Sequence, residues 1–273
     1  MKKEKKSKTF IQTIKERGPT LPIGIVDPSG SSLHKDIKLR PWRMKEEREL
    51  GELRDKHKDS TIASYISMVL GTMCTKLGCH DFSNISLDQK RLIIGQMYMA
   101  DVFYAYVWLR INSLGADFPV TFNPPWSNQE IKIAADLNSV ETACAKEIKD
   151  IHWNYKLVNP ITMRGKEITE FKMTQQRWYS LESINTTNST NQTITKQSFL
   201  LASIMGCKEL DEDIAPTSQE LDELTKLDLE RLSFLIDDKA LGPKMVIEGS
   251  HNGREFTTPI DWGYDNFFAV SSV

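Results

Sequence analysis

Two segments of the chain repeat one pattern, the first in the middle and the second near the end. Residues 118–137 read FPVTFNPPWSNQEIKIAADL, and residues 243–262 read PKMVIEGSHNGREFTTPIDW. In each segment, alternating apolar residues stand on both sides of a polar turn. Alternation with period two puts every second side chain on one face of a strand, so each segment is predicted to form a β-hairpin with one buried face. Two such units separated by helices indicate a scaffold built for contact.

The length and net charge of the chain exclude few classes of protein. The chain has 273 residues, which suits one large domain or two small ones. Its formal net charge of −2 gives no overall attraction to nucleic acid or membrane. Residues 2–8, KKEKKSK, are strongly basic. They are interpreted either as a solubilising terminus or as an arm that becomes ordered on an acidic partner or on nucleic acid.

Motifs for catalysis or cofactor binding are not found in the sequence. It contains no phosphate-binding glycine loop, no HExxH and no nucleophile elbow. The cysteines are scattered and lack the paired spacing of zinc ligands, so structural thiols are predicted. We therefore predict no cofactor, no metal and no catalytic residue, and we expect the protein not to be an enzyme. The cysteines are Cys74, Cys79, Cys144 and Cys207.

Proline and glycine divide the N-terminal half. Residues 18–40 are rich in both and are predicted to form an extended arm with a short strand at 37–39. Helices are expected at 42–56 and 61–77. A capping box, Ser86 with Gln89, predicts a long helix reaching about residue 113. Because this helix is apolar on most sides, it is expected to be the central helix of its domain.

The C-terminal half alternates between the two kinds of structure. After the first hairpin, a helix is expected near 137–149, followed by a strand pair at 155–173. A second capping box, Thr217 with Glu220, predicts helical structure to about residue 241. The predicted fold is α+β, a helical core with a long central helix, several β-hairpins and an extended N-terminal arm. The expected divisions are 1–40 (basic tail and arm), 41–150 (helical domain with the first hairpin) and 151–273 (second α+β region).

A tryptophan at a predicted hairpin tip is the strongest candidate contact residue. Trp126 follows two prolines, where burial inside its own domain is difficult, and exposed aromatic residues often anchor interfaces. Packing within the core is the alternative interpretation. The arm is expected to lie on another surface, either its own domain's or a neighbour's. The candidate partner interface comprises Pro28, Leu33, Trp42, Pro124, Pro125 and Trp126.

The order of these features resembles the baseplate hub or tail assembly proteins of contractile-tailed phages of the T-even group. The resemblance covers the chain from about residue 21 to its end and is one of arrangement. An arm, LPIGIVDPSGSSL, leads to IKLRPWRMKEERELGEL, which matches a short strand and a charged helix. ISLDQKRLIIGQMYMADVFYAYVWLRINSLGADFPVTFNPPW matches a long helix followed by a hairpin. LTKLDLERLSFLIDDKALGPKMVIEGSHNGREFTTPIDWGYDNFFAVSS matches a helix, a hairpin and a terminal FF.

This resemblance implies a structural component of a tail baseplate, in the hub or wedge region, that binds neighbouring tail subunits in a multimeric assembly. The expected location is the virion, and the host cytoplasm during assembly. A baseplate assembly chaperone absent from the mature virion is the alternative. Many relatives carry cysteine pairs at the hairpin tips, consistent with a metal site. Because residues 123–126 and 250–253 read NPPW and SHNG here, no structural metal is expected.

Overall fold

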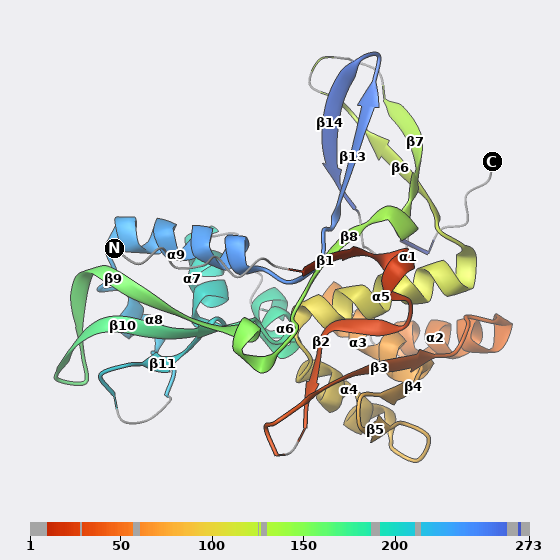
Figure 1. Cartoon of the computed structure of the whole chain (residues 1–273). Helices are drawn as coiled ribbons and strands as arrows, with labels where there is room; N and C mark the ends of the chain where they lie inside the picture. Colours follow the sequence, from red (N-terminus) through yellow and green to blue (C-terminus); the bar gives the residue numbers. More distant parts are fainter. Residues whose placement is uncertain are drawn as a thin grey trace.

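The computed structural model, drawn in Figure 1, describes residues 10–27, 29–56, 61–124, 126, 130–186, 192–210, 214–260 and 267–268. Within these residues the helices are α1 (Ile14–Arg17), α2 (Met44–Lys56), α3 (Ile62–Met73), α4 (Leu87–Gly95), α5 (Met99–Leu114), α6 (Trp178–Thr186), α7 (Gln192–Leu201), α8 (Ser218–Leu221) and α9 (Lys226–Lys239), with short 3-10 helices η1 (Leu137–Ser139) and η2 (Ile148–Ile151). The strands are β1 (Phe10–Thr13), β2 (Thr20–Val26), β3 (Leu33–Leu39), β4 (Cys74–Leu77), β5 (His80–Asp81), β6 (Asp117–Phe122), β7 (Ile131–Asp136), β8 (Glu141–Cys144), β9 (His152–Met163), β10 (Lys166–Thr174), β11 (Ile204–Cys207), β12 (Gly242–Pro243), β13 (Val246–His251) and β14 (Arg254–Pro259).

These strands form five small antiparallel sheets among the described residues. Their orders are β2-β3-β4-β5, β1-β8-β12, β11-β10-β9, β6-β7 and β13-β14. Three parts are visible in Figure 1: a body of α1–α6 with the first two sheets, a side region of β9–β11 with α7–α9, and two hairpins above the body. One large hydrophobic cluster fills the body, and a second lies between the β9–β11 sheet and its helices.

The prediction of a long central helix is wrong, because the chain breaks it into α4 and α5. Gln96 ends α4, and Tyr98 adopts the extended conformation of an N-cap residue, with φ −69° and ψ 145°. A distant segment binds the main chain at the break. Met99 donates its N–H to the carbonyl oxygen of Gln176, and Trp178 donates to that of Met97. These tertiary hydrogen bonds replace helical ones, so the local capping pattern does not reveal the break.

The predicted extended N-terminal arm is also wrong, because residues 20–39 are built into the body. β2 and β3 form part of the four-stranded sheet, and Leu21, Ile23 and Ile37 are buried in the core. The prolines and glycines exclude a helix as expected, but they do not exclude a strand at the edge of a sheet. The helix expected at 137–149 is likewise replaced by η1, β8 and η2.

A buried carboxylate fixes β2 to the central part of the body. Asp101 lies in the first turn of α5 and is fully buried. Its oxygens accept hydrogen bonds from the main-chain N–H groups of Ile23 and Gly24, at 2.8 Å and 2.9 Å. Burial raises the pKa of Asp101 to about 6, against the opposing effect of these bonds and of Lys35 and Arg17.

Asp228, at the start of α9, plays a similar part in the side region. Its carboxylate accepts hydrogen bonds from the N–H groups of Val158 and Asn159 in β9, at 2.8 Å and 3.2 Å, and from the Tyr155 hydroxyl at 3.0 Å. The Thr225 hydroxyl also donates to it, at 2.8 Å. Burial alone would raise the pKa of Asp228, but the hydrogen bonds outweigh it and hold the pKa below its ordinary value.

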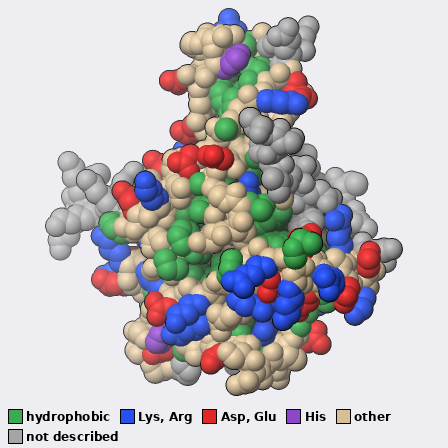
Figure 2. All heavy atoms as spheres, turned by 90° about the vertical axis from the view of Figure 1, so that its right-hand side faces the viewer, with side chains coloured by type: hydrophobic (Ala, Val, Ile, Leu, Met, Phe, Trp, Pro, Cys, Tyr) green, Lys and Arg blue, Asp and Glu red, His purple; other side chains and the backbone are tan. Residues whose placement is uncertain are grey.

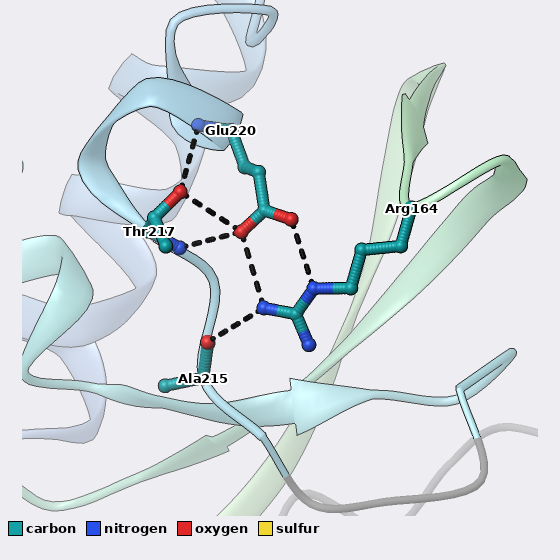
Figure 3. Close-up of polar contacts among 4 residues, drawn as sticks. All are labelled: Arg164, Ala215, Thr217 and Glu220. Carbon is teal, nitrogen blue, oxygen red and sulfur yellow. Dashed lines mark hydrogen bonds and ion pairs between the residues drawn. The ribbon is translucent and has the colours of Figure 1, made fainter.

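A surface ion pair joins the β9–β10 turn to α8, as Figure 3 shows. Arg164 donates from Nε to Oε1 of Glu220 at 2.9 Å and from Nη2 to Oε2 at 3.2 Å. The predicted capping box is confirmed, because Thr217 donates its N–H to Glu220 at 2.7 Å and accepts from the Glu220 N–H at 3.3 Å. The bond from Arg164, followed by that from Thr217, lowers the pKa of Glu220 to about 2.

Candidate partner interface

Two hairpins distant in sequence stand side by side and project from the body (Figure 1). They are β6–β7 and β13–β14, and together they are named the twin-hairpin lobe. Each hairpin has six paired positions, which confirms the two hairpins predicted from alternation. The second turns at Asn252 and Gly253, with φ of 52° and 75°. Both values are positive, as a two-residue hairpin turn that follows the strand twist requires.

The apolar faces of the two hairpins pack against each other. The rings of Phe122 and Phe256 are stacked, with centroids 4.2 Å apart. At the base, Phe118 lies 5.4 Å from the ring of Phe267, between centroids. Since neither two-stranded hairpin is stable alone in water, this mutual burial stabilises both. The buried apolar residues of the lobe are Phe118, Val120, Ile131, Ala135, Ile247 and Phe256.

Trp126 lies at the tip of the lobe and contacts the other hairpin. The residue is half-buried, and the guanidinium of Arg254 lies 6.0 Å from its ring centroid. Such a cation–π contact is worth about 0.5–1 kcal/mol at an exposed site. Pro124 is buried, and Pro125 lies outside the described residues. Trp126 therefore presents part of its ring to the outside while leaning on the second hairpin.

The other candidate residues lie in the body, apart from the lobe. Leu33, in β3, is half-buried and packs on a small cluster that includes Ile23 and Tyr98. Trp42 is half-buried against Phe268, with ring centroids 4.4 Å apart. Pro28 falls outside the described residues. The predicted contact residues therefore do not lie on one surface. Leu33 was expected on an extended arm, but that segment is a strand of the body.

A groove between the two hairpins was missed by the sequence reasoning. Its volume is about 470 Å³, and β7 and β13 form its sides. Asp136, Glu141, Lys244 and Glu248 supply its charges. Lys244 forms an ion pair with Glu248, which raises the pKa of Lys244 above its ordinary value. The groove could not be predicted, because it exists only when hairpins more than a hundred residues apart become neighbours.

The aromatic rings and methyl groups of the lobe are mostly buried between its hairpins, and Trp126 is half-buried at its tip. Within the described ranges, no three His, Cys, Asp or Glu side chains are placed to hold a metal ion. The helices described here include none with the length and apolarity needed to cross a membrane. Figure 2 shows hydrophobic side chains on the lobe and a band of Lys and Arg side chains across the lower body.

Fold and site together define a protein of helices and small antiparallel sheets from which the twin-hairpin lobe projects. The sequence matches the family described as T4 bacteriophage base plate protein over residues 28–226, which is well over half of the chain. The chain therefore belongs to the T4 bacteriophage base plate protein family. This membership implies other phage tail proteins as partners and a location in the tail of the virion. Neither the curated proteins nor the solved structures gave a match.

The residues that match the family include only one of the two hairpins of the lobe. The first hairpin, β6–β7, lies inside the matched residues, whereas β13–β14 begins at Val246, beyond their end at residue 226.

Proposed function

We propose that this protein is a non-enzymatic structural subunit in the hub or wedge region of a contractile tail baseplate. It binds neighbouring tail proteins through the twin-hairpin lobe while the tail assembles in the host cytoplasm. Family membership supports the baseplate part of this proposal. The twin-hairpin lobe supports the binding role, because it projects from the body and leaves Trp126 partly accessible at its tip.

Contacts within the lobe hold its two hairpins together before a partner binds. Phe122 stacks on Phe256 between the hairpins, and Arg254 holds the Trp126 ring at the tip. Arg110 and Phe267 fix the base of the first hairpin to α5. A contact surface ordered before binding loses less conformational entropy when a partner arrives, so more of the contact energy becomes affinity.

The proposal is tested by replacing the gene with one that encodes Trp126→Ala and Arg254→Ala together. The purified double variant is expected to remain folded, by circular dichroism, but to be lost from purified tails analysed by mass spectrometry. Phe234→Ala is the matched control, because Phe234 is an aromatic residue exposed on α9, outside the lobe. Normal incorporation of the folded double variant would contradict docking through the lobe.

Mass spectrometry of purified tails also distinguishes a structural subunit from an assembly chaperone. A structural subunit is present in finished wild-type tails in a fixed ratio to the other baseplate proteins. A protein required for tail formation but missing from finished tails would instead be an assembly chaperone, and the structural role would be rejected.

A further inference from the structure

The groove of the twin-hairpin lobe is bordered by strand edges that have no strand partner among the described residues. β7 pairs only with β6, and β13 pairs only with β14, so each strand has a free edge. Residues 133–136 of β7 and 246–250 of β13 line the groove. Free main-chain N–H and C=O groups along an exposed strand are a template for pairing with another strand.

The register of β6–β7 shows which groups of β7 face this free edge. In an antiparallel pair, alternate residues turn their N–H and C=O toward the partner strand and away from it. Leu137 donates its N–H to the carbonyl oxygen of Ala116 at 2.9 Å, which fixes the alternation. Lys132, Ala134 and Asp136 are then the residues of β7 whose main-chain groups point away from β6. Of these groups, the carbonyl oxygen of Asp136 already accepts a hydrogen bond from the Ser139 hydroxyl at 2.7 Å.

The same reasoning applies to β13. Ile260 donates its N–H to the carbonyl oxygen of Met245 at 3.0 Å, so these two residues form a hydrogen-bonded pair. The residues that lie two, four and six positions after Met245 in β13 are therefore hydrogen-bonded to β14 as well. The main-chain groups of Val246, Glu248 and Ser250, which alternate with the bonded positions, point away from β14. The Val246 N–H donates to the carbonyl oxygen of Lys244 at 2.7 Å, whereas the outward groups of Glu248 and Ser250 form no main-chain hydrogen bond with another described residue.

Prolines block the outer edges of the lobe but not the inner ones. Pro119 on β6 and Pro259 on β14 both stand at positions whose main-chain groups face outward. Proline has no N–H to donate, and it is a common device against unwanted strand pairing. β7 and β13 contain no proline. The chain therefore protects the far edge of each hairpin and leaves the edges beside the groove able to pair.

The side chains of the groove define the chemistry of an occupant. Ile133, Ile247 and Phe256 give it an apolar wall. The carboxylates of Asp136, Glu141 and Glu248 outnumber the single ammonium group of Lys244, so the groove carries excess negative charge. β7 also carries Lys132 near the tip, whereas β13 carries no lysine. Because the Asp136 carbonyl oxygen on β7 already accepts a hydrogen bond from Ser139, whereas the outward groups of Glu248 and Ser250 have no main-chain partner among the described residues, β13 offers the freer edge.

We infer that the inter-hairpin groove receives an extended segment of another tail protein, which adds as a strand to the free edge of β13. The segment has alternating apolar residues that face the wall and Lys or Arg residues that face Asp136 and Glu141. About four to five of its residues fit along the lining strands. This inference deepens the proposed function and rests on it for the origin of the partner.

The test uses the full-length protein and a fluorescent peptide of alternating valine and lysine, with binding followed by anisotropy. The wild type is expected to bind it saturably. Ser250→Pro removes an N–H that faces the groove and should weaken binding about tenfold or more. Thr257→Pro is the matched control, because Thr257 lies opposite Glu248 and its N–H faces the outer edge of the same hairpin. It should bind within about twofold of wild type.

A second measurement does not depend on any variant of the protein. Methylating alternate amides of the peptide removes its strand-pairing donors without changing its charge, and this should abolish binding. Replacing lysine with glutamate should weaken binding about tenfold or more. Equal binding of the methylated peptide, or of a Ser250→Pro variant with an unchanged circular dichroism spectrum, would overturn the inference. So would a wild-type protein that binds no peptide.

Sedimentation of the protein alone tests a different occupant. If the wild type forms a dimer that Ser250→Pro abolishes, a second copy fills the groove and the inference of a partner strand is rejected. Failure of the strand-addition inference can be distinguished from failure of the proposed baseplate function. A protein that enters tails through the lobe but binds no peptide keeps the baseplate role and loses only the strand site.

Discussion

Arg110 donates its Nε–H to the carbonyl oxygen of Phe267, 157 residues further along the chain, at 2.9 Å. The guanidinium also donates to the carbonyl oxygens of Gly115 and Asp117, where α5 ends and β6 begins. Arg110 is almost completely buried, with 1% of its surface exposed. One side chain thus holds together the end of α5, the base of the first hairpin and the Phe267 segment.

Replacing Arg110 with Met is expected to lower the free energy of unfolding by about 3 kcal/mol or more. Methionine keeps much of the volume but leaves the buried carbonyl oxygen of Phe267 without a donor, which costs about 1–3 kcal/mol, and it removes two part-buried charged hydrogen bonds to Gly115 and Asp117. Urea denaturation followed by tryptophan fluorescence measures the change. Arg48→Met, at an exposed position on α2, should change stability by less than about 0.5 kcal/mol. Equal stability of the two variants would refute the bridging role of Arg110.

Asp101 should make the protein less stable as pH rises from about 4 to about 6. The pKa of Asp101 is about 6 in the folded protein, against an ordinary value of 3.8. Between these values the unfolded chain has released the proton and the folded chain still holds it. Rising pH therefore favours unfolding, by about 3 kcal/mol across the window.

The urea midpoint measured at several pH values tests this effect. Asp101→Asn cannot ionise, so it should flatten the fall in stability between pH 4 and 6, whereas Asp88→Asn, on the exposed surface of α4, should leave it unchanged. An undiminished slope in Asp101→Asn would show that another group is responsible.

Glu220 should show the opposite dependence. Its pKa of about 2 lies below the ordinary 4.5, so its contribution to stability is complete above 4.5 and is lost as pH falls toward 2. Arg164→Gln removes the largest cause and should move the pKa of Glu220 back toward 4.5. Carboxyl carbon NMR titration measures this shift directly. A pKa unchanged in the variant would mean that the Thr217 capping bonds alone depress it.

Two tryptophans should respond differently to truncation in the isolated protein. Trp178 is fully buried, and its Nε1 donates to the Ser67 hydroxyl at 2.7 Å. Trp178→Ala is expected to cost about 3–5 kcal/mol, as for other buried tryptophans. Trp126→Ala, at the tip of the lobe, should cost no more than about 1 kcal/mol. Similar losses in thermal denaturation would identify Trp126 as a core residue and weaken its assignment to an interface.

Local patterns in the sequence predicted the local elements. Alternation located both hairpins, and the reciprocal Ser/Thr and Gln/Glu pairs located the starts of α4 and α8. These signals operate over a few residues, so one sequence is enough to see them. The Phe122–Phe256 contact has no such signal, because either residue would suit a hairpin that packed elsewhere.

The errors arose where distant segments decide the outcome. Nothing within residues 86–113 shows that the main chain near Met97 will bond to a segment around Trp178. In the same way, β3 joins a sheet because β4, some 35 residues later in the chain, pairs with it, and β2 then pairs with the other edge of β3. The groove of the candidate site also depends on a long separation, because β7 and β13 are more than a hundred residues apart in the chain.

The wide spacing of the two halves of the lobe has a consequence during protein synthesis. Ribosomes finish β7 at Asp136 more than a hundred codons before they reach β14. Until then the apolar face of the first hairpin has no cover, and contacts between such distant segments form slowly. A translation product interrupted before Phe267 would thus carry an incomplete lobe, in which the base of the first hairpin lacks one of its contacts.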